Sequence, residues 1–169
     1  MDVADVLVDG LARVREGVER VLDGVGDALT WQPDPQANTI AWLVWHLTRA
    51  QDAQVADVAG AQQSWTAGGW QQRLALPLDA HDTGYGHTPE QVRAVVADPD
   101  LLLGYHREVH DRSTAWVRTL TPPDLDRIVD TRWDPPVSLG VRLVSVLDDD
   151  MQHVGQAAYL RGLAERSQH

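Results

Sequence analysis

An aspartate and a histidine, both residue types that bind metal ions, lie four positions apart in the last apolar segment of the chain, where residues 148–153 read DDDMQH. On a helix, Asp149 and His153 point to the same side with roughly 5–6 Å between their Cβ atoms, which lets both side chains bind one ion. Asp150, three positions before His153, meets the same condition, whereas Asp148 points away. This segment is therefore expected to supply part of a metal site.

The best candidate for a further ligand is His46, which interrupts the most hydrophobic helical segment of the sequence, residues 40–49. His46 flanks the apolar row of that segment, one turn after Trp42, and His153 borders the apolar row of its own segment. If the two flanks face each other, His46, Asp149 and His153 meet between two helices, where helical bundles commonly bind metals. The alternative is a pair of histidines at the edge of the core that bond to Asp or water.

Further side chains, among them Trp42, are candidates for substrate contact or for support of the ligands. Gln156 lies one turn beyond the predicted ligands, close enough to orient one of them or a bound water. His106 and His110 also have metal-binding spacing, but the Glu that the zinc-protease motif HExxH requires after the first histidine is missing. One of these two is a candidate for the cleft. Tyr85 and His87 lie in an irregular segment and are candidates for substrate contact.

The spacing of apolar residues predicts the elements that position these side chains. It indicates four long amphipathic helices, over residues 3–28, about 39–60, about 100–120 and 139 to about 162. Asn38 and Ser138 are the predicted N-caps of the second and fourth helices, and Gly60 is the expected end of the second. At 169 residues the chain is expected to form one domain. The predicted fold is all-α, a four-helix bundle with long crossover connections.

The predicted connections differ in character. Residues 61–87 contain glycines and a proline with little periodicity, and their length makes them a candidate lid or wall of the site. Residues 88–91 read TPEQ, a capping box with proline at the first helical position, and Asp98 with the following proline breaks the helical segment that begins there. Residues 121–137 look irregular except for an extended piece at 127–129.

Composition excludes several classes of function. Asp and Glu number 25 against 14 Lys and Arg, a net charge of -11, so the field of the chain repels nucleic acids and anionic membranes. Cysteine is absent, which removes disulfides, thiolate ligands and a cysteine nucleophile, and any thiol chemistry needs an external thiol. The start of the sequence lacks a basic, apolar leader, and no run of 18 apolar residues occurs, so a cytoplasmic protein is expected.

Two motifs resemble those of the DinB-like superfamily of four-helix bundles. They are Trp45-His46-Leu47 and the segment at 153–159, HVGQAAY, which is similar to an HxGQxxY signature. The chain looks like the group that contains mycothiol-dependent maleylpyruvate isomerases and related thiol transferases, and residues 84–90, GYGHTPE, resemble an actinobacterial branch. The resemblance implies a metal held by His46, Asp149 and His153. Many members have histidine where Asp149 stands, while isomerase-like ones can place a carboxylate there.

The expected function is that of a divalent-metal-dependent enzyme that acts on a small molecule. Zn²⁺ is the expected ion and mycothiol a candidate co-substrate, in S-transfer or thiol-assisted isomerisation. The alternatives are a metal-dependent hydrolase and a non-catalytic bundle that binds a small ligand. The resemblance also implies a homodimer, to which exposed tryptophans such as Trp65, Trp70 or Trp116 could contribute; the alternative is that these tryptophans pack in the core or the lid.

Overall fold

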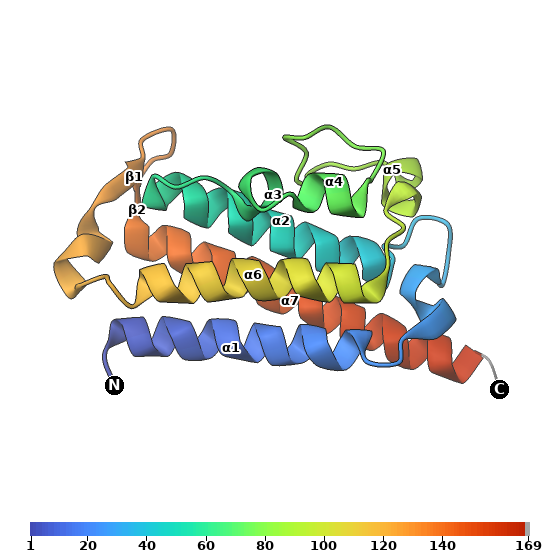
Figure 1. The fold of residues 1–169 in the computed structure, drawn as a ribbon. Helices are drawn as coiled ribbons and strands as arrows, with labels where there is room; N and C mark the ends of the chain where they lie inside the picture. Colours follow the sequence, from blue (N-terminus) through green and yellow to red (C-terminus); the bar gives the residue numbers. More distant parts are fainter. Residues whose placement is uncertain (168–169) are drawn as a thin grey trace.

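Four long helices make up most of the structure, a computed structural model that describes residues 1–167. They are α1 (Val3–Leu22), α2 (Ile40–Ala59), α6 (Pro99–Val117) and α7 (Leu139–Ser167) (Figure 1). The predicted all-α fold, a four-helix bundle with long connections, is confirmed.

The four long helices form a ring in which each packs against two neighbours. Both α1 and α2 pack against α6 and α7, so α1 lies diagonally across from α2, and α6 diagonally across from α7. In Figure 1, α1 and α7 run in one direction and α2 and α6 run in the other. Because α2 and α6 are parallel, the chain between them, residues 60–98, returns along the length of the bundle. This return segment is the longest of the crossovers that the sequence predicts.

Capping residues and glycines determine the ends of the first two long helices. Thr39, and not the predicted Asn38, caps α2, because its hydroxyl accepts a hydrogen bond of 3.0 Å from the backbone of the first turn. Gly60 ends α2 as predicted, with a φ of 64°. The first helix stops at Leu22 instead of residue 28, because Gly24 adopts a φ of 60°, which an α-helix cannot contain.

The last two long helices begin where the sequence predicts. α6 starts directly after Asp98, and α7 starts after Ser138, whose hydroxyl accepts a hydrogen bond of 3.3 Å from the N–H of Val141. α7 continues to Ser167, past its expected end near Gly162. Glycine permits a helix to end but does not require it, so the residue alone was a weak signal.

The connections contain more regular structure than the sequence predicts. The return segment holds the short helices α3 (Ser64–Ala67), α4 (Trp70–Leu74) and α5 (Pro89–Ala94), the last of which begins with the predicted capping box. The other two connections hold the 3-10 helices η1 (Gly26–Thr30) and η2 (Pro122–Asp126) and the strands β1 (Ile128–Asp130) and β2 (Val137–Ser138). The two strands pair antiparallel, so the predicted extended piece is part of a small hairpin.

The hydrophobic core extends from the bundle interior to the space beneath α3 and α4. Trp65 and Trp70 are buried there, with ring centroids 5.4 and 5.7 Å from that of Tyr105. These two tryptophans therefore anchor the return segment to the bundle. The suggestion that these two supply an exposed dimer contact is therefore wrong. Trp116 is half-buried and packs against a second, smaller hydrophobic cluster.

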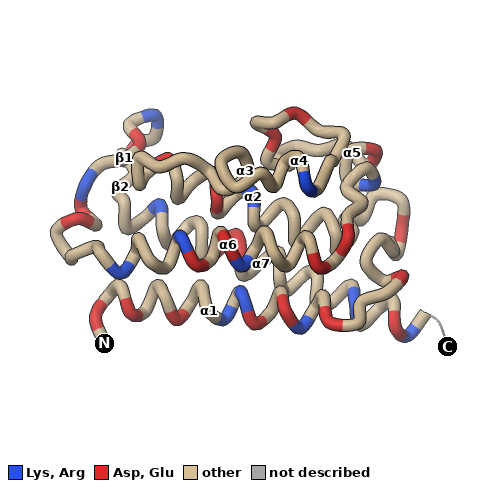
Figure 2. Tube along the Cα trace, in the orientation of Figure 1, with Lys and Arg blue, Asp and Glu red and all other residues tan. Residues whose placement is uncertain are grey.

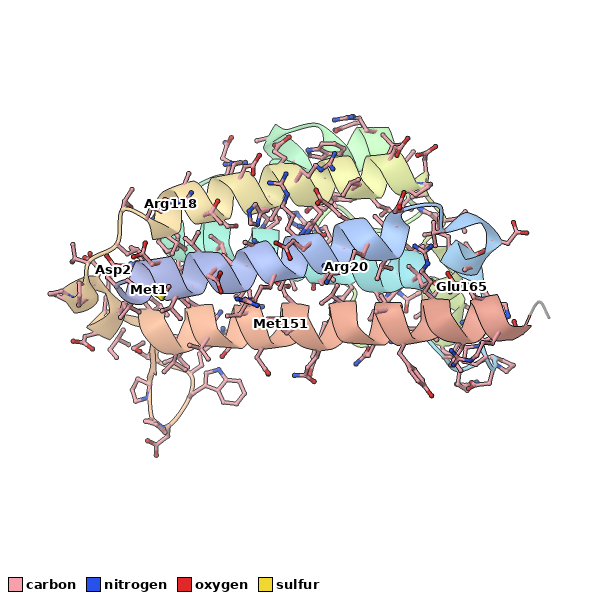
Figure 3. All side chains as sticks on the ribbon, turned by 90° about the horizontal axis from the view of Figure 1, so that it is seen from below. Met1, Asp2, Arg20, Arg118, Met151 and Glu165 are labelled. Carbon is pink, nitrogen blue, oxygen red and sulfur yellow. The ribbon has the colours of Figure 1, made fainter. Side chains whose placement is uncertain are left out.

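Helices α1 and α7 approach each other closely, and Figure 3 shows them side by side. A Cβ atom at Gly10 would lie 2.6 Å from Leu147, and one at Gly17 would lie 2.7 Å from Val154. Because real Cβ atoms do not come so near, a side chain at either position would require the facing side chain or α7 to move. Leu147 is flexible and Val154 is β-branched and stiff, so Gly17 is the position where glycine matters more for the packing of α1 on α7.

Charged residues of both signs are interspersed along the long helices, as Figure 2 shows. Several form ion pairs one turn apart, for example Arg13 with Asp9 and Arg161 with Glu165. None of the helices within residues 1–167 combines the length and the hydrophobicity that a bilayer-spanning segment requires.

Candidate metal centre

Helices α2 and α7 bring three metal-binding side chains to one place. His46 comes from α2, and Asp149 and His153 come from α7. Each offers a ligand atom, and these atoms all lie within 4.8 Å of one another. The imidazole centroids of His46 and His153 are 4.8 Å apart, and Nε2 of His153 lies 3.5 Å from Oδ1 of Asp149. The spacing in the sequence and the packing of α2 on α7 therefore produce a cluster of two histidines and one carboxylate.

The position of His46 follows from the unusual burial of α2. This helix is covered by α6, by α7 and by the return segment, and its residues 40–52 are all buried. His46 is stacked on Trp42, one turn earlier, with ring centroids 4.6 Å apart and planes 10° from parallel. Trp42 also meets His153 edge-on at 6.2 Å. The indole therefore packs against both histidines of the centre.

The return segment holds His46 in one orientation. Nδ1 of His46 lies 2.5 Å from the carbonyl oxygen of Thr83. A carbonyl only accepts hydrogen bonds, so Nδ1 carries the proton and Nε2 keeps its lone pair. Gly84 lies so close that a Cβ atom there would be 2.7 Å from Nδ1, and its φ of 92° favours glycine. The segment thus selects Nε2 of His46 as the ligand atom.

The three side chains have different protonation properties. Burial lowers the pKa of His46, so this imidazole is neutral at pH 7, and the bond to Thr83 only partly opposes the effect. The hydrogen bond between His153 and Asp149 raises the pKa of His153 and lowers that of Asp149. Without metal, His153 is therefore the side chain of the three that is most readily protonated near neutral pH. A cation that binds His153 must displace its proton, so we expect binding to weaken as pH falls.

The donor set fits a divalent transition metal. Two imidazole nitrogens and one carboxylate oxygen are typical ligands of Zn²⁺, and three protein ligands leave a position for water or substrate. The exposed fractions of the His153 and Asp149 side chains are 16% and 37%, so this side of the centre is accessible to solvent. Oε1 of Gln156 accepts a hydrogen bond of 3.3 Å from Nδ1 of His153, which directs Nε2 toward the cluster.

The structure distinguishes Asp149 from Asp150, which the sequence left as alternative ligands, and places Asp148 away from both histidines as predicted. Asp149 belongs to the cluster, whereas Asp148 accepts a hydrogen bond from Gln152 on the outer surface of α7. Asp150, which had remained an alternative ligand, is fully buried, and burial raises its pKa well above the ordinary value. Its side chain is therefore buried in the protein and is not part of the cluster.

His106 and His110 do not join this cluster. They lie on α6, which is diagonally across the ring from α7, and both are buried. Nδ1 of His106 lies 3.1 Å from the hydroxyl of Thr48, and burial lowers the pKa of His106 to about 3. Both side chains are therefore part of the buried interior. The suggestion that one of them faces the cleft is not supported by their position.

The two candidates from the return segment differ in their surroundings. His87 is buried, and its Nδ1 accepts a hydrogen bond of 3.0 Å from the indole N–H of Trp42. Tyr85 is 94% exposed and extends into solvent next to Gly84. Of the predicted lid or wall at 61–87, the part near Gly84 is the portion that covers His46.

Three residues near His46 were not predicted from the sequence: Asp82, Thr83 and Arg49. Asp82 Oδ1 accepts a hydrogen bond of 2.8 Å from the N–H of Gly84, a turn that the Asp-Thr-Gly order could have indicated. Arg49 donates to the carbonyl of Asp82 over 3.2 Å. Nothing in the local sequence shows that this turn lies over His46, because the contact joins residues far apart in the chain.

Comparison with known proteins agrees with the fold and with the motifs. Residues 10–157 match the DinB superfamily. A search of curated proteins found no match. The crystal structure of a conserved protein from Enterococcus faecalis is similar, with 31% sequence identity, a TM-score of 0.88, and coverage of 95% of this chain and 96% of the other. The chain therefore belongs to the DinB superfamily.

Proposed function

We propose that this protein is a metal-dependent enzyme that uses an external low-molecular-weight thiol to transform a small electrophilic substrate. The observation that carries the proposal is the convergence of His46, Asp149 and His153, whose ligand atoms lie within 4.8 Å of one another beside a solvent-accessible surface. Zn²⁺ is the ion that we propose for this donor set, and the cytoplasm is the proposed location.

A divalent cation held there would supply positive charge that lowers the pKa of a nearby thiol or water toward neutrality. The residues of the centre would contribute in different ways. His46 provides a neutral imidazole with a fixed tautomer, and Asp149 provides a charge that reduces the net charge of the centre. Gln156 orients His153.

The proposal that the nucleophile is an external thiol rests on two points. The chain contains no cysteine, so the protein cannot supply a thiol of its own. Its motifs also resemble the group of mycothiol-dependent isomerases and thiol transferases within the superfamily. We therefore propose mycothiol as the co-substrate, with S-transfer or thiol-assisted isomerisation as the reaction.

The test compares Zn²⁺-loaded protein in two assays, one with mycothiol and an electrophile such as maleylpyruvate, and one with amide and ester substrates. We expect turnover in the first assay, a loss of at least about 100-fold in His153→Ala, and little change in Asp148→Ala, because Asp148 lies outside the cluster. Turnover of esters or amides alone would replace the proposal with the hydrolase alternative. Metal-loaded protein without turnover in either assay would favour a non-catalytic ligand-binding bundle.

A further inference from the structure

We propose that Asp82, His87 and Trp42 form a positioning relay that holds the imidazole of His46 ready to bind metal. The relay connects the return segment to α2 through two consecutive hydrogen bonds and one ring stack. In this assignment His87 is neither a ligand nor a contact for substrate. The inference rests on the metal centre proposed above, but it concerns residues that lie outside the ligand set.

The hydrogen bonds of His87 determine its tautomer. The indole N–H of Trp42 can only donate, so Nδ1 of His87, at 3.0 Å, must accept. The other nitrogen, Nε2, lies 2.8 Å from a carboxylate oxygen of Asp82 and must donate to it. Both nitrogens of His87 are therefore engaged, and neither is free to bind an ion. With a side chain that is only 3% exposed, His87 is also inaccessible to substrate.

The bond from Trp42 to His87 fixes the plane of the indole. Trp42 lies nearly parallel to the imidazole of His46, and His87 itself stacks on Trp45 with centroids 5.8 Å apart and planes 18° from parallel. His46 is thus confined by the face of Trp42 and by the carbonyl of Thr83. Rotation of the Trp42 ring would release one of these two constraints.

The relay is anchored to a buried charged residue of α2. Arg49 is fully buried, and it donates to the carbonyl of Asp82 and to the side chain of Gln63, at 3.2 and 3.0 Å. Its guanidinium lies 3.7 Å from Asp52, one turn further along α2, which balances its charge. Asp82 is therefore held from both sides, by Arg49 at its carbonyl and by His87 at its carboxylate. This anchoring explains why a loop can orient a histidine within a packed helix.

The first experiment reads the tautomers in metal-free protein by ¹⁵N NMR of the histidine rings at pH 7.5. We expect His46 to carry its proton on Nδ1 and His87 to carry its proton on Nε2. In His87→Ala, the tautomer of His46 should persist, because the carbonyl of Thr83 selects it. The ring carbon and ring C–H signals of His46 should shift and broaden, because the stacked Trp42 ring loses the bond that fixes its plane. Ring signals of His46 that are unchanged in His87→Ala would overturn the relay. Because no metal is present, this result is independent of whether the wild-type protein binds Zn²⁺.

The second experiment measures the affinity for Zn²⁺ by competition with a chelating dye. We expect His87→Ala to weaken binding by about 10-fold or more, in the range usual for residues that orient metal ligands. His87→Asn keeps an acceptor near the position of Nδ1 and should recover part of the loss. His81→Ala is the matched control, since His81 is an exposed histidine of the same segment and should bind as the wild type does.

A double-mutant cycle separates the relay from general destabilisation. Trp42→Phe removes the donated N–H, so His87→Ala should weaken binding much less in that background than in the wild type. Full additivity of the two losses, or equal affinity of His87→Ala and wild type, would overturn the proposal. If His87→Ala does not fold, His87→Asn and Trp42→Phe replace it in the test. The relay predicts that both variants bind Zn²⁺ more weakly than the wild type. Wild-type affinity in both would contradict the relay.

Discussion

At the scale of single residues, the five buried or half-buried histidines of the described chain show how context divides one residue type into different roles; they are His46, His87, His106, His110 and His153. Sequence spacing indicated His46 and His153 as candidate ligands, because both flank apolar rows on helices. It could not show that His106 lies away from them, because the ring order that places α6 diagonally across from α7 is not visible in the sequence. Nor could it show that His87 meets Trp42, because that contact depends on the path of the return segment.

His106 gives a prediction for stability against pH. Its pKa is about 3 in the folded protein because of burial, against about 6.5 in the unfolded chain. Above pH 6.5 both states are neutral at this residue, and its contribution to stability does not change with pH. Between pH 6.5 and 3 only the unfolded state binds the proton, so stability is lost as pH falls, by up to about 1.4 kcal/mol per pH unit.

His106→Asn tests this prediction. Thr48 uses its own hydroxyl proton for the carbonyl of Val44, so the N–H of His106 donates to Thr48, and an Asn amide can replace that donor. Urea unfolding between pH 7 and 4.5 should show a shallower decline for His106→Asn than for wild type, whatever their difference at pH 7. Parallel declines would show that His106 is not the buried neutral group described here.

At the scale of elements, the sequence predicted the four long helices but not all of their ends or contacts. The periodicity of apolar residues and N-caps such as Ser138 and Thr88 are local signals, so they can be recognised in the sequence. The early end of α1 at Leu22 could not be recognised in the sequence. Glycine permits the positive φ that Gly24 adopts, but its presence in the sequence does not show that the residue adopts it. The close contact of α1 with α7 also escaped, since Gly10 and Gly17 resemble any other glycine until the facing helix is known.

The contact between α1 and α7 predicts opposite effects for two glycine-to-alanine changes. Gly17→Ala should destabilise the protein by up to about 2 kcal/mol, because the overlap of the new Cβ with Val154, a stiff β-branched residue, outweighs the gain of roughly 0.5–1 kcal/mol in helix propensity inside α1. Gly155→Ala should stabilise it by about 0.5–1 kcal/mol, because Gly155 lies inside α7 with open space around it. Urea unfolding of both variants is the measurement. A Gly17→Ala protein at least as stable as wild type would show that α1 and α7 are further apart than described.

At the scale of the whole molecule, the metal centre combines three segments that are distant in the chain. The ring of helices brings α2 to α7, and the return segment between the parallel helices α2 and α6 passes over His46. The sequence could predict the bundle and the meeting of the three candidate ligands, because helical spacing determines which faces carry them. It could not predict the wall formed near Thr83, which depends on the route of a long connection.

The most direct test of the account is the metal content of the purified protein after equilibration with Zn²⁺ and removal of free ion. Elemental analysis should find about one ion per chain in the wild type and in the neighbouring control Asp148→Ala. His46→Ala, Asp149→Ala and His153→Ala should each lose most of the bound ion while keeping the helical circular dichroism of the wild type. Full occupancy in folded Asp149→Ala would contradict the assignment of the centre.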